Sequence, residues 1–378
     1  MKKILMLLSN PFRPDVRVYK EAISLIKGGY DVTVVAWDRG KRYPKNEVTE
    51  KIRVKRLQIS SIYGNFLSFI LKLPLFWLAT FTVMVKKDFD VVHCHDFDTL
   101  PIGFLIAKFR RKKLVYDAHE WYSKMVSETA PKFILRIIDV AEKYFVKKAD
   151  LVITVSNAFA KIFTEYCAKK VIVTMNCPII EYPSPKSVDE IKSKINPNSK
   201  LLILYIGVLE PGRNLEEIAN TVSNLKKEGL LFVIGGFGSL EKQLKEKSDE
   251  KNVIFIGRVD LKDVPAYVFA ADILLITYDP SNPNNRLNLP NKLFEAMIAG
   301  KPVVVTKNSE AGTIVRKKRC GITVDYFNPD EVISAFYSLK NDKKIYAELS
   351  RNGIKASKEI YNWGIMEKKL IDAYADMM

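Results

Sequence analysis

Short apolar runs alternate with longer amphipathic stretches along this chain. One series comprises KKILMLLS, YDVTVVAW, FDVVHCHD, KKLVYDAHE, ADLVITVS and KKVIVTMN, and a second comprises LLILYIG, LLFVIGG, NVIFIG, ADILLIT and KPVVVT. Runs of about four to eight residues rich in Val, Ile and Leu are typical of strands buried on both faces of a parallel sheet. Because amphipathic stretches separate the runs, both halves of the chain are predicted to be doubly wound α/β domains.

Residues 181–200, EYPSPKSVDEIKSKINPNSK, interrupt this pattern between the two series. Apolar density falls here and three prolines occur. Such a composition is typical of an exposed connection between domains. The segment is therefore predicted to be a linker, with one domain over 1–180 and a second over 181–356.

Two predicted helices follow strands closely. In residues 16–27, apolar side chains recur at roughly helical spacing, and Gly28 and Gly29 supply a stop. A second helix is predicted to begin at Asn291 and to end at Gly300. Open α/β sheets place their ligands at the carboxyl ends of strands, so both helices are expected to border a ligand site.

Residues 66–85, FLSFILKLPLFWLATFTVMV, form a segment that is unusually apolar for a soluble α/β domain. The segment is nearly long enough to span a bilayer, and Lys72 is its single charge. Pro74 near its centre, Lys72 itself and the strands on either side argue against a span. A helix lying on a membrane surface or an ordinary buried helix is favoured, and both alternatives remain open.

Charge and cysteine usage narrow the partners and the compartment. The formal net charge of +17 suits nucleic acid, an anionic membrane surface or phosphate-bearing substrates. No recognition-helix, zinc-finger or aromatic stacking signature is found, so no nucleic-acid partner is expected. The four cysteines lack paired short spacing, and the N-terminal apolar run is short and lacks a cleavage site. A cytoplasmic protein without a signal peptide is predicted.

Several blocks resemble glycosyltransferase family 4, the retaining enzymes of the GT-B fold. The second half contributes YIGVLEPGRNLEEIA, FVIGGFGS, VIFIGRV, ADILLIT and LPNKLFEAMIAGKPVVV. The first half contributes PDVRVYKEA, DVVHCHDFDTLP, LVYDAHEWY and ADLVITVS, in the order found in that family. The closing YNWGIMEKKLIDAYADM resembles the family's final helix, which crosses back onto the first domain.

The resemblance implies two Rossmann-like domains with a cleft between them, and a C-terminal helix over 357–378 that packs on the first domain. It implies transfer of a sugar from a UDP- or GDP-sugar to an acceptor hydroxyl, with the anomeric configuration retained. The nucleotide-sugar is then a co-substrate, and no other cofactor and no metal is expected. A glycan or lipid-linked acceptor would suit a peripheral enzyme at the inner face of the cell membrane, held there through residues 66–85.

Donor-side residues follow from the same resemblance. Asn291 opens a helix whose amide groups and dipole favour a diphosphate, and Lys292 and Arg213 would oppose the charge on the leaving diphosphate. Glu295 matches the carboxylate that accepts hydrogen bonds from the ribose hydroxyls. Further donor contacts are expected from Gly236, Gly238, Arg258, Glu310 and Thr313.

Two departures from the family pattern leave the donor sugar open. Val208 stands where the family has a second basic residue, and Lys292 is expected to supply that charge instead. Leu287 stands where an acidic residue contacts the donor sugar, so Asn288 or Asn291 would have to read the sugar hydroxyls.

Acceptor-side residues are expected at the strand ends of the first domain. His119 is the predicted catalytic residue that positions the reacting groups by hydrogen bonding, and His95 and Asp96 are expected to shape the acceptor side. Asp15 and Arg17 either border the substrates or form a helix cap with a surface ion pair. His93 and His95 alternate onto one face of a strand, but GT-B enzymes generally hold no catalytic metal in this way.

Two other functions remain as alternatives at this stage. A GT-B nucleotide-sugar epimerase would need the donor but no acceptor, and the apolar segment 66–85 speaks against it. A basic nonenzymatic nucleic-acid-binding protein would explain the charge and would show salt-dependent binding without nucleotide-sugar binding. The oligomeric state is not predicted.

Overall fold

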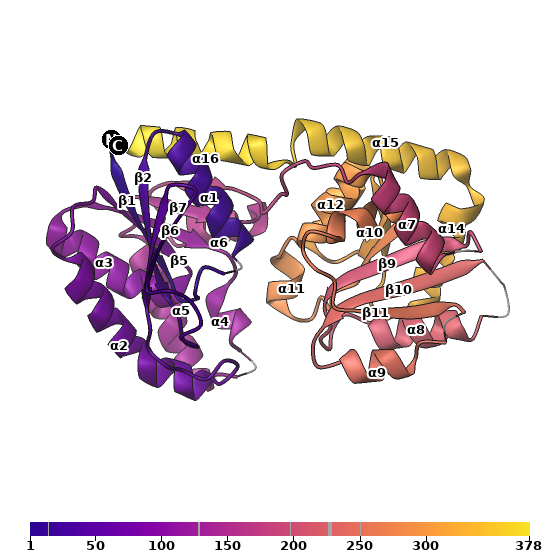
Figure 1. The fold of residues 1–378 in the computed structure, drawn as a ribbon, viewed down its shortest axis with the longest axis horizontal. Helices are drawn as coiled ribbons and strands as arrows, with labels where there is room; N and C mark the ends of the chain where they lie inside the picture. The colour runs from indigo at the N-terminus through magenta and orange to yellow at the C-terminus, as the bar shows by residue number, and fades with distance from the viewer. Residues whose placement is uncertain (14, 128, 197, 226–228, 250) are drawn as a thin grey trace. The chain divides into compact units, whose positions relative to one another are not determined.

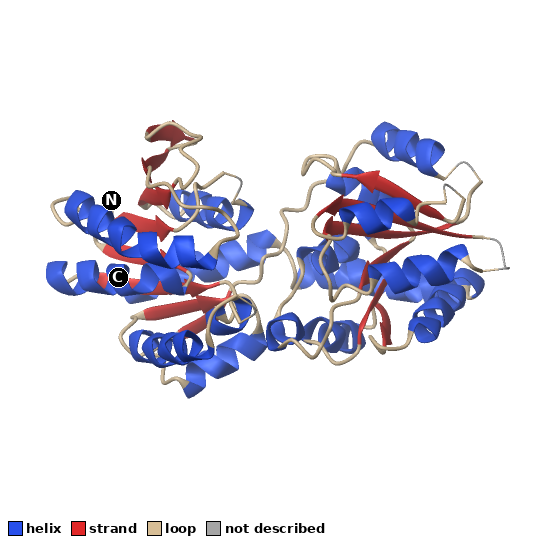
Figure 2. Ribbon diagram, turned by 90° about the horizontal axis from the view of Figure 1, so that it is seen from below, coloured by secondary structure: helices blue, strands red, loops and turns tan. Residues whose placement is uncertain are grey.

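The chain forms two compact units in the computed structural model, which describes residues 1–13, 15–127, 129–196, 198–225, 229–249 and 251–378. The first unit contains Met1–Met175 together with Met366–Met378, and the second contains Asn176–Ile365. Each unit is a sheet flanked by helices on both faces (Figure 1 and Figure 2). The two doubly wound α/β domains predicted from the sequence are confirmed.

The first unit is built on an eight-stranded sheet with the order β3-β4-β2-β1-β5-β6-β7-β8. All neighbouring strands are parallel except the β3–β4 pair, which is antiparallel. The strands are β1 (Lys3–Leu8), β2 (Asp31–Trp37), β3 (Asn46–Thr49), β4 (Ile52–Leu57), β5 (Val91–His95), β6 (Lys113–Ala118), β7 (Leu151–Thr154) and β8 (Val171–Val173).

The second unit has a six-stranded, wholly parallel sheet with the order β11-β10-β9-β12-β13-β14. Its strands are β9 (Leu201–Val208), β10 (Leu230–Phe237), β11 (Val253–Gly257), β12 (Ile273–Ile276), β13 (Val303–Thr306) and β14 (Gly321–Val324). Every apolar run in the two predicted series forms a strand. The strands β3, β4 and β14 were not predicted from the sequence.

Helices of the first unit cover both faces of its sheet. They are α1 (Val16–Lys27), α2 (Phe66–Met84), the 3-10 turn η1 (Phe97–Thr99), α3 (Leu100–Arg110), α4 (Tyr122–Met125), α5 (Lys132–Val146) and α6 (Asn157–Glu165). As predicted, α1 ends before Gly28 and Gly29, and Gly29 has a positive φ of 85°. The last helix, α16 (Trp363–Met377), adds Leu370, Ala373 and Tyr374 to the core that α1 forms with this sheet. Residues 357–365, which were predicted to belong with that helix, lie in the second unit.

Helices of the second unit are α7 (Pro185–Ile195), α8 (Leu215–Ser223), α9 (Glu241–Glu246), α10 (Val264–Ala270), α11 (Pro283–Leu287), α12 (Asn291–Ala299), α13 (Glu310–Lys318), α14 (Pro329–Asn341) and α15 (Lys343–Glu359). The helix predicted from Asn291 is α12, and its C-cap Gly300 adopts the left-handed conformation at φ 64°.

The linker predicted over 181–200 is wrong, because most of this segment forms α7. Ser184 caps the helix by accepting a hydrogen bond from the Ser187 backbone amide, and Pro185 occupies the first turn. Ile195 is buried, and α7 packs against α10 of the second unit. Proline at a helix start was misread as a sign of irregular chain.

Each sheet has a point where the strand order reverses. In the first sheet it lies between β1 and β5, and in the second between β9 and β12. Loops that leave the carboxyl ends of such strands diverge to opposite faces, and the space between them is where open α/β sheets bind ligands. Both groups of predicted site residues follow strands at or next to these points.

Candidate active site

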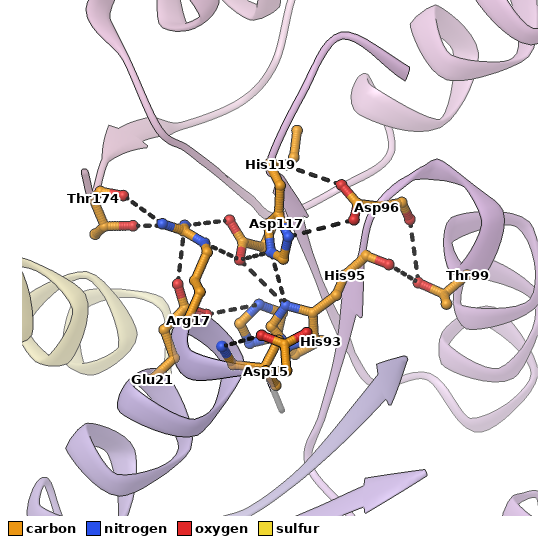
Figure 3. Close-up of polar contacts among 12 residues, drawn as sticks. Asp15, Arg17, Glu21, His93, His95, Asp96, Thr99, Asp117, His119 and Thr174 are labelled. Atoms are coloured by element: carbon orange, nitrogen blue, oxygen red, sulfur yellow. Dashed lines mark hydrogen bonds and ion pairs between the residues drawn. The ribbon is translucent and has the colours of Figure 1, made fainter. Parts of the chain in front are cut away.

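A cluster of charged side chains gathers at the carboxyl ends of β5 and β6 in the first unit (Figure 3). The Asp117 carboxylate lies 2.8 Å from His119 Nε2 and 3.2 Å from His95 Nδ1. Asp96 accepts a hydrogen bond from the His119 backbone amide at 3.1 Å and lies 3.4 Å from its ring Nδ1. Three predicted residues, His95, Asp96 and His119, are thus brought together around Asp117.

Arg17 is buried beneath this cluster rather than exposed at the surface. Its guanidinium donates to both oxygens of Asp117, at 2.7 and 3.2 Å, and to the Thr174 backbone oxygen at 2.8 Å (Figure 3). It also lies 2.9 Å from Glu21, one turn further along α1. The surface ion pair offered as an alternative for Arg17 is therefore wrong, whereas Asp15 caps α1 by accepting a hydrogen bond from the Val18 amide.

Neighbouring charges in this cluster shift one another's pKa values. Burial lowers the pKa of His119, but Asp96 and Asp117 outweigh it and raise that pKa to about 10. Burial raises the pKa of Asp117, but Arg17 and His119 more than offset this and hold it well below its usual range. Burial lowers the pKa of His95. At neutral pH, His119 is an imidazolium that can donate hydrogen bonds, and His95 is neutral.

Four of the buried side chains could offer atoms to a cation. Glu21, His93, His95 and Asp117 each have one such atom within 4.8 Å of the others. However, the Arg17 guanidinium already contacts Glu21 and Asp117, and the His119 imidazolium contacts Asp117. Two resident positive charges oppose a divalent ion at this position, so the expectation that the protein holds no metal stays a prediction.

Replacing His119 by glutamine should make stability less dependent on pH. The folded-state pKa of about 10 lies above the ordinary value of 6.5, so the imidazolium stabilises the fold fully below pH 6.5. That contribution is lost as pH rises towards 10. We expect His119→Gln to cost about 2 kcal/mol at pH 6 and little at pH 10. Urea unfolding between pH 6 and pH 10 measures this loss of unfolding free energy. An equal loss at pH 6 and pH 10 would contradict the assignment of His119 as an imidazolium in the folded state.

A second cluster forms between β9 and α12 in the second unit. The Lys292 ammonium lies 3.6 Å from the centroid of the Tyr205 ring, and the Arg213 guanidinium lies 3.9 Å from the centroid of the Tyr278 ring. Arg213 also donates a hydrogen bond to the Asn285 side chain at 3.2 Å. Two cations are thus held side by side on tyrosine faces.

The ammonium nitrogen of Lys292 is buried in this cluster and forms no hydrogen bond with any residue that the structure describes. Burial and, to a smaller extent, the neighbouring Arg213 lower the pKa of Lys292 to about 7, against an opposing effect of Glu295. The nitrogen lies against Gly207, where an added Cβ would approach it to 3.0 Å. Among the described residues, this ammonium has no anionic hydrogen-bond partner that would keep it charged at neutral pH.

The N-terminus of α12 lies at this cluster, because Lys292 is in the first turn of the helix. Its N-cap is Pro290, which has no side-chain acceptor for the amides of the first turn. Its first two residues are the exposed Asn291 and the half-buried Lys292. Glu295 lies one turn further along the helix and is half-buried. A helix N-terminus next to two cations favours a diphosphate.

The remaining predicted donor residues lie on neighbouring loops of the second unit. A Cβ on Gly236 would lie 1.8 Å from the Gly207 oxygen, and one on Gly238 would lie 2.4 Å from the Leu209 oxygen, so packing against β9 already requires both glycines. Arg258 follows β11, is exposed and lies over the Phe237 ring. Glu310 and Thr313 lie in the first turns of α13.

Sequence reasoning missed Asp117, Glu21, Tyr205 and Tyr278. Asp117 had a visible signal, because a carboxylate interrupts the apolar run of β6 two residues before His119. Glu21 lies four residues after Arg17 on a helix, where side chains meet. Tyr205 lies in the apolar run LLILYIG and Tyr278 directly follows the run ADILLIT, and both runs were interpreted only as buried strands.

Comparisons with known proteins agree with this architecture. A model described as "Glycosyltransferase Family 4" matches residues 15–179, and one described as "Glycosyl transferases group 1" matches residues 200–342. An uncharacterized glycosyltransferase of Methanocaldococcus jannaschii is 23% identical over 373 residues, covering 93% of this chain and 91% of its own.

Two solved structures have the same fold over the whole chain. Sucrose-phosphate synthase from Thermosynechococcus elongatus has a TM-score of 0.82 at 16% identity, covering 100% of this chain and 99% of its own. Anabaena HepE in complex with UDP-glucose has a TM-score of 0.75 at 16% identity, with 100% of both chains covered. The chain therefore belongs to the family 4-like glycosyltransferases of the GT-B fold.

Proposed function

We propose that this glycosyltransferase moves a sugar from a UDP- or GDP-sugar to an acceptor hydroxyl with retention of the anomeric configuration. The observation that carries the proposal is the buried Lys292 ammonium, which lies beside Arg213 at the start of α12 and lacks an anionic partner among the described residues. HepE, which has the same fold, binds UDP-glucose. The donor is the co-substrate, and the reaction uses no further cofactor.

Lys292 and Arg213 would stabilise the departing diphosphate. The bond between the anomeric carbon and the β-phosphate oxygen breaks, and the acceptor oxygen forms its new bond on the same face of the sugar. The acceptor hydroxyl gives its proton to an oxygen of the departing diphosphate, and the nucleoside diphosphate leaves with the remaining charge. Fixed cations and the dipole of α12 favour that charge without having to reorganise.

Glu295 would accept hydrogen bonds from the ribose hydroxyls, since a carboxylate offers only acceptors. Gly236, Gly238, Arg258, Glu310 and Thr313 complete the proposed donor side. Because Leu287 is apolar, Asn288 or Asn291 would contact the sugar.

The proposed acceptor side is the cluster of the first unit. The His119 imidazolium donates hydrogen bonds and would position an acceptor or donor oxygen. His95 and Asp96 shape its surroundings, Arg17 orients Asp117, and Asp15 holds the start of α1. The acceptor would be a glycan or a lipid-linked sugar, and the reaction would take place in the cytoplasm at the membrane surface.

Thermal unfolding with a panel of UDP, GDP, ADP and their sugar conjugates tests the donor site. A ligand at about 100 times its Kd stabilises the folded state by about 2.7 kcal/mol, which corresponds to roughly 5 °C or more for a unit of this size. We expect one nucleotide to raise the melting temperature and Glu295→Ala to abolish the shift. Glu359→Ala, at an exposed position on α15, is the matched control and should keep it. No shift with any nucleotide would overturn the proposal.

A further inference from the structure

Three helices of the first unit expose apolar side chains on one face of the sheet. The crossovers through α2, α3 and α5 all run in the same direction across the sheet, so right-handed connections place these helices on the same face. Phe81 on α2 meets Phe109 on α3 at 5.9 Å, and Phe104 on α3 meets Tyr144 on α5 at 6.2 Å. The three helices are therefore neighbours on this face, with α3 packed against both α2 and α5 (Figure 1).

Ten large hydrophobic side chains on this surface are between 49% and 71% exposed: Leu67, Leu71, Leu75, Leu78, Leu105, Phe109, Phe133, Ile137, Val140 and Tyr144. The four on α2 and the four on α5 recur at helical spacing, so each helix presents an apolar stripe to solvent. Scattered exposed apolar residues are ordinary, but two apolar stripes on helices that both pack against α3 are not.

Exposed basic residues accompany the two stripes. They are Lys72, Lys86, Lys87, Lys108, Arg111, Lys132, Arg136, Lys143, Lys147 and Lys148. The three helices contain only two acidic residues, Asp139, which is half-buried, and Glu142, which is buried. Beyond the helix ends, Asp88 follows Lys87 and is exposed, but it forms an ion pair with Lys3. An apolar stripe with basic neighbours on helices that carry no exposed acid is typical of a helix that lies in the interface of an anionic bilayer.

The packing of α2 argues against a transmembrane span. By length and composition α2 could cross a membrane. However, Phe76 is fully buried and stacks on Trp37 at 4.9 Å, and Trp77 Nε1 donates a hydrogen bond to the Asp98 backbone oxygen at 2.7 Å. A span would remove these contacts, whereas interfacial binding keeps them and buries only the exposed stripe.

We propose that α2, α3 and α5 together bind the surface of an anionic lipid bilayer, with both apolar stripes inserted at the headgroup level and the basic residues facing lipid phosphates. Each basic residue near the surface adds to the attraction, and the stripes add apolar burial. This goes beyond the segment 66–85 suggested by composition, because α5 supplies four of the ten exposed apolar side chains. The proposal does not depend on sugar transfer.

Sedimentation of the full chain with vesicles tests this surface. We expect binding to phosphatidylcholine vesicles that contain about one third phosphatidylglycerol, and much weaker binding to phosphatidylcholine alone. The variants Leu71→Gln/Leu75→Gln and Phe133→Gln/Ile137→Gln should each reduce partitioning at least about 10-fold. Leu261→Gln/Phe327→Gln, at exposed apolar positions of the second unit, is the matched control and should bind like the wild type.

Three outcomes would overturn the proposal. The first is vesicle binding unaffected by the α5 variant and resistant to alkaline extraction, which would indicate a span through α2. The second is a dimer that both stripe variants dissociate, without vesicle binding. The third is binding equal on neutral and anionic vesicles. Unchanged melting temperatures show that the variants fold, and an unchanged nucleotide-induced shift separates failure here from failure of the donor site.

Discussion

Lys292→Met is expected to weaken nucleoside diphosphate binding about 10- to 100-fold at pH 6.5, where the wild-type ammonium is mostly charged. The physical reason is that a buried ammonium with no anionic partner among the described residues gains most from an incoming diphosphate. Methionine keeps the length of the side chain and its contact with Tyr205 but removes the charge. Calorimetric titration with UDP or GDP measures the loss.

The same variant should remove the pH dependence of binding. With a free-state pKa of about 7, wild-type Lys292 must take up a proton to bind above that pH, so affinity should fall by up to about 10-fold per pH unit between 7 and 9. The terminal phosphate of the nucleotide has a second pKa of roughly 6, so it is mostly ionised above pH 7 and contributes little to this slope. Lys292→Arg, which stays charged, should bind with a flat profile. If affinity changed with pH in the same way for the wild type, Lys292→Met and Lys292→Arg, proton uptake by Lys292 on binding would be excluded.

Arg17→Met is expected to lower the free energy of unfolding by about 3 kcal/mol near neutral pH. The change leaves the buried Asp117 carboxylate without its bidentate partner, although His119 still contacts it. Urea unfolding followed by tryptophan fluorescence is a suitable measurement, because Trp37, Trp77 and Trp121 all lie in the first unit.

The size of this loss should depend on pH and on burial. Arg17 depresses the pKa of Asp117, so the stabilisation is present above the ordinary carboxylate pKa and is lost as pH falls. The difference in the free energy of unfolding between the wild type and Arg17→Met should therefore become smaller at acidic pH. Arg53→Met, which removes an exposed ion pair with Asp31 in the same unit, should cost less than about 1 kcal/mol. Equal losses for the two arginines would show that burial of the Arg17 pair is not what stabilises the fold.

The sequence predicted most of the sheets because buried parallel strands are continuous apolar runs. It could not predict β3 and β4 in the same way, since NEVT and IRVKRL alternate polar and apolar residues beside an antiparallel edge. The segment that forms α7 was misassigned because Pro185 and Ser184 at a helix start resemble loop composition. Only the buried face of that helix distinguishes it from a linker.

Site residues could be predicted from the sequence when they are polar residues of a recognised motif and lie at the end of a predicted strand. His95, Asp96 and His119 met that condition, whereas Glu21 depends on the rotation of α1 against the sheet. The orientation of Arg17 also depends on tertiary packing, because its partners Asp117 and Thr174 are 100 and 157 residues away. The exposed apolar stripe of α5 could not be predicted from the sequence either, because apolar residues occur on both the buried and the exposed side of that helix.

Proton uptake on nucleotide binding tests the central claim most directly. Titrating UDP and GDP into the protein at pH 8, in two buffers with different heats of ionisation, measures the number of protons taken up. The account predicts that one of the two nucleotides binds wild type with uptake of about one proton, and that Lys292→Met binds it weakly with almost none. Binding without proton uptake, or the same uptake in both proteins, would contradict the assignment of Lys292 and Arg213 as the diphosphate site.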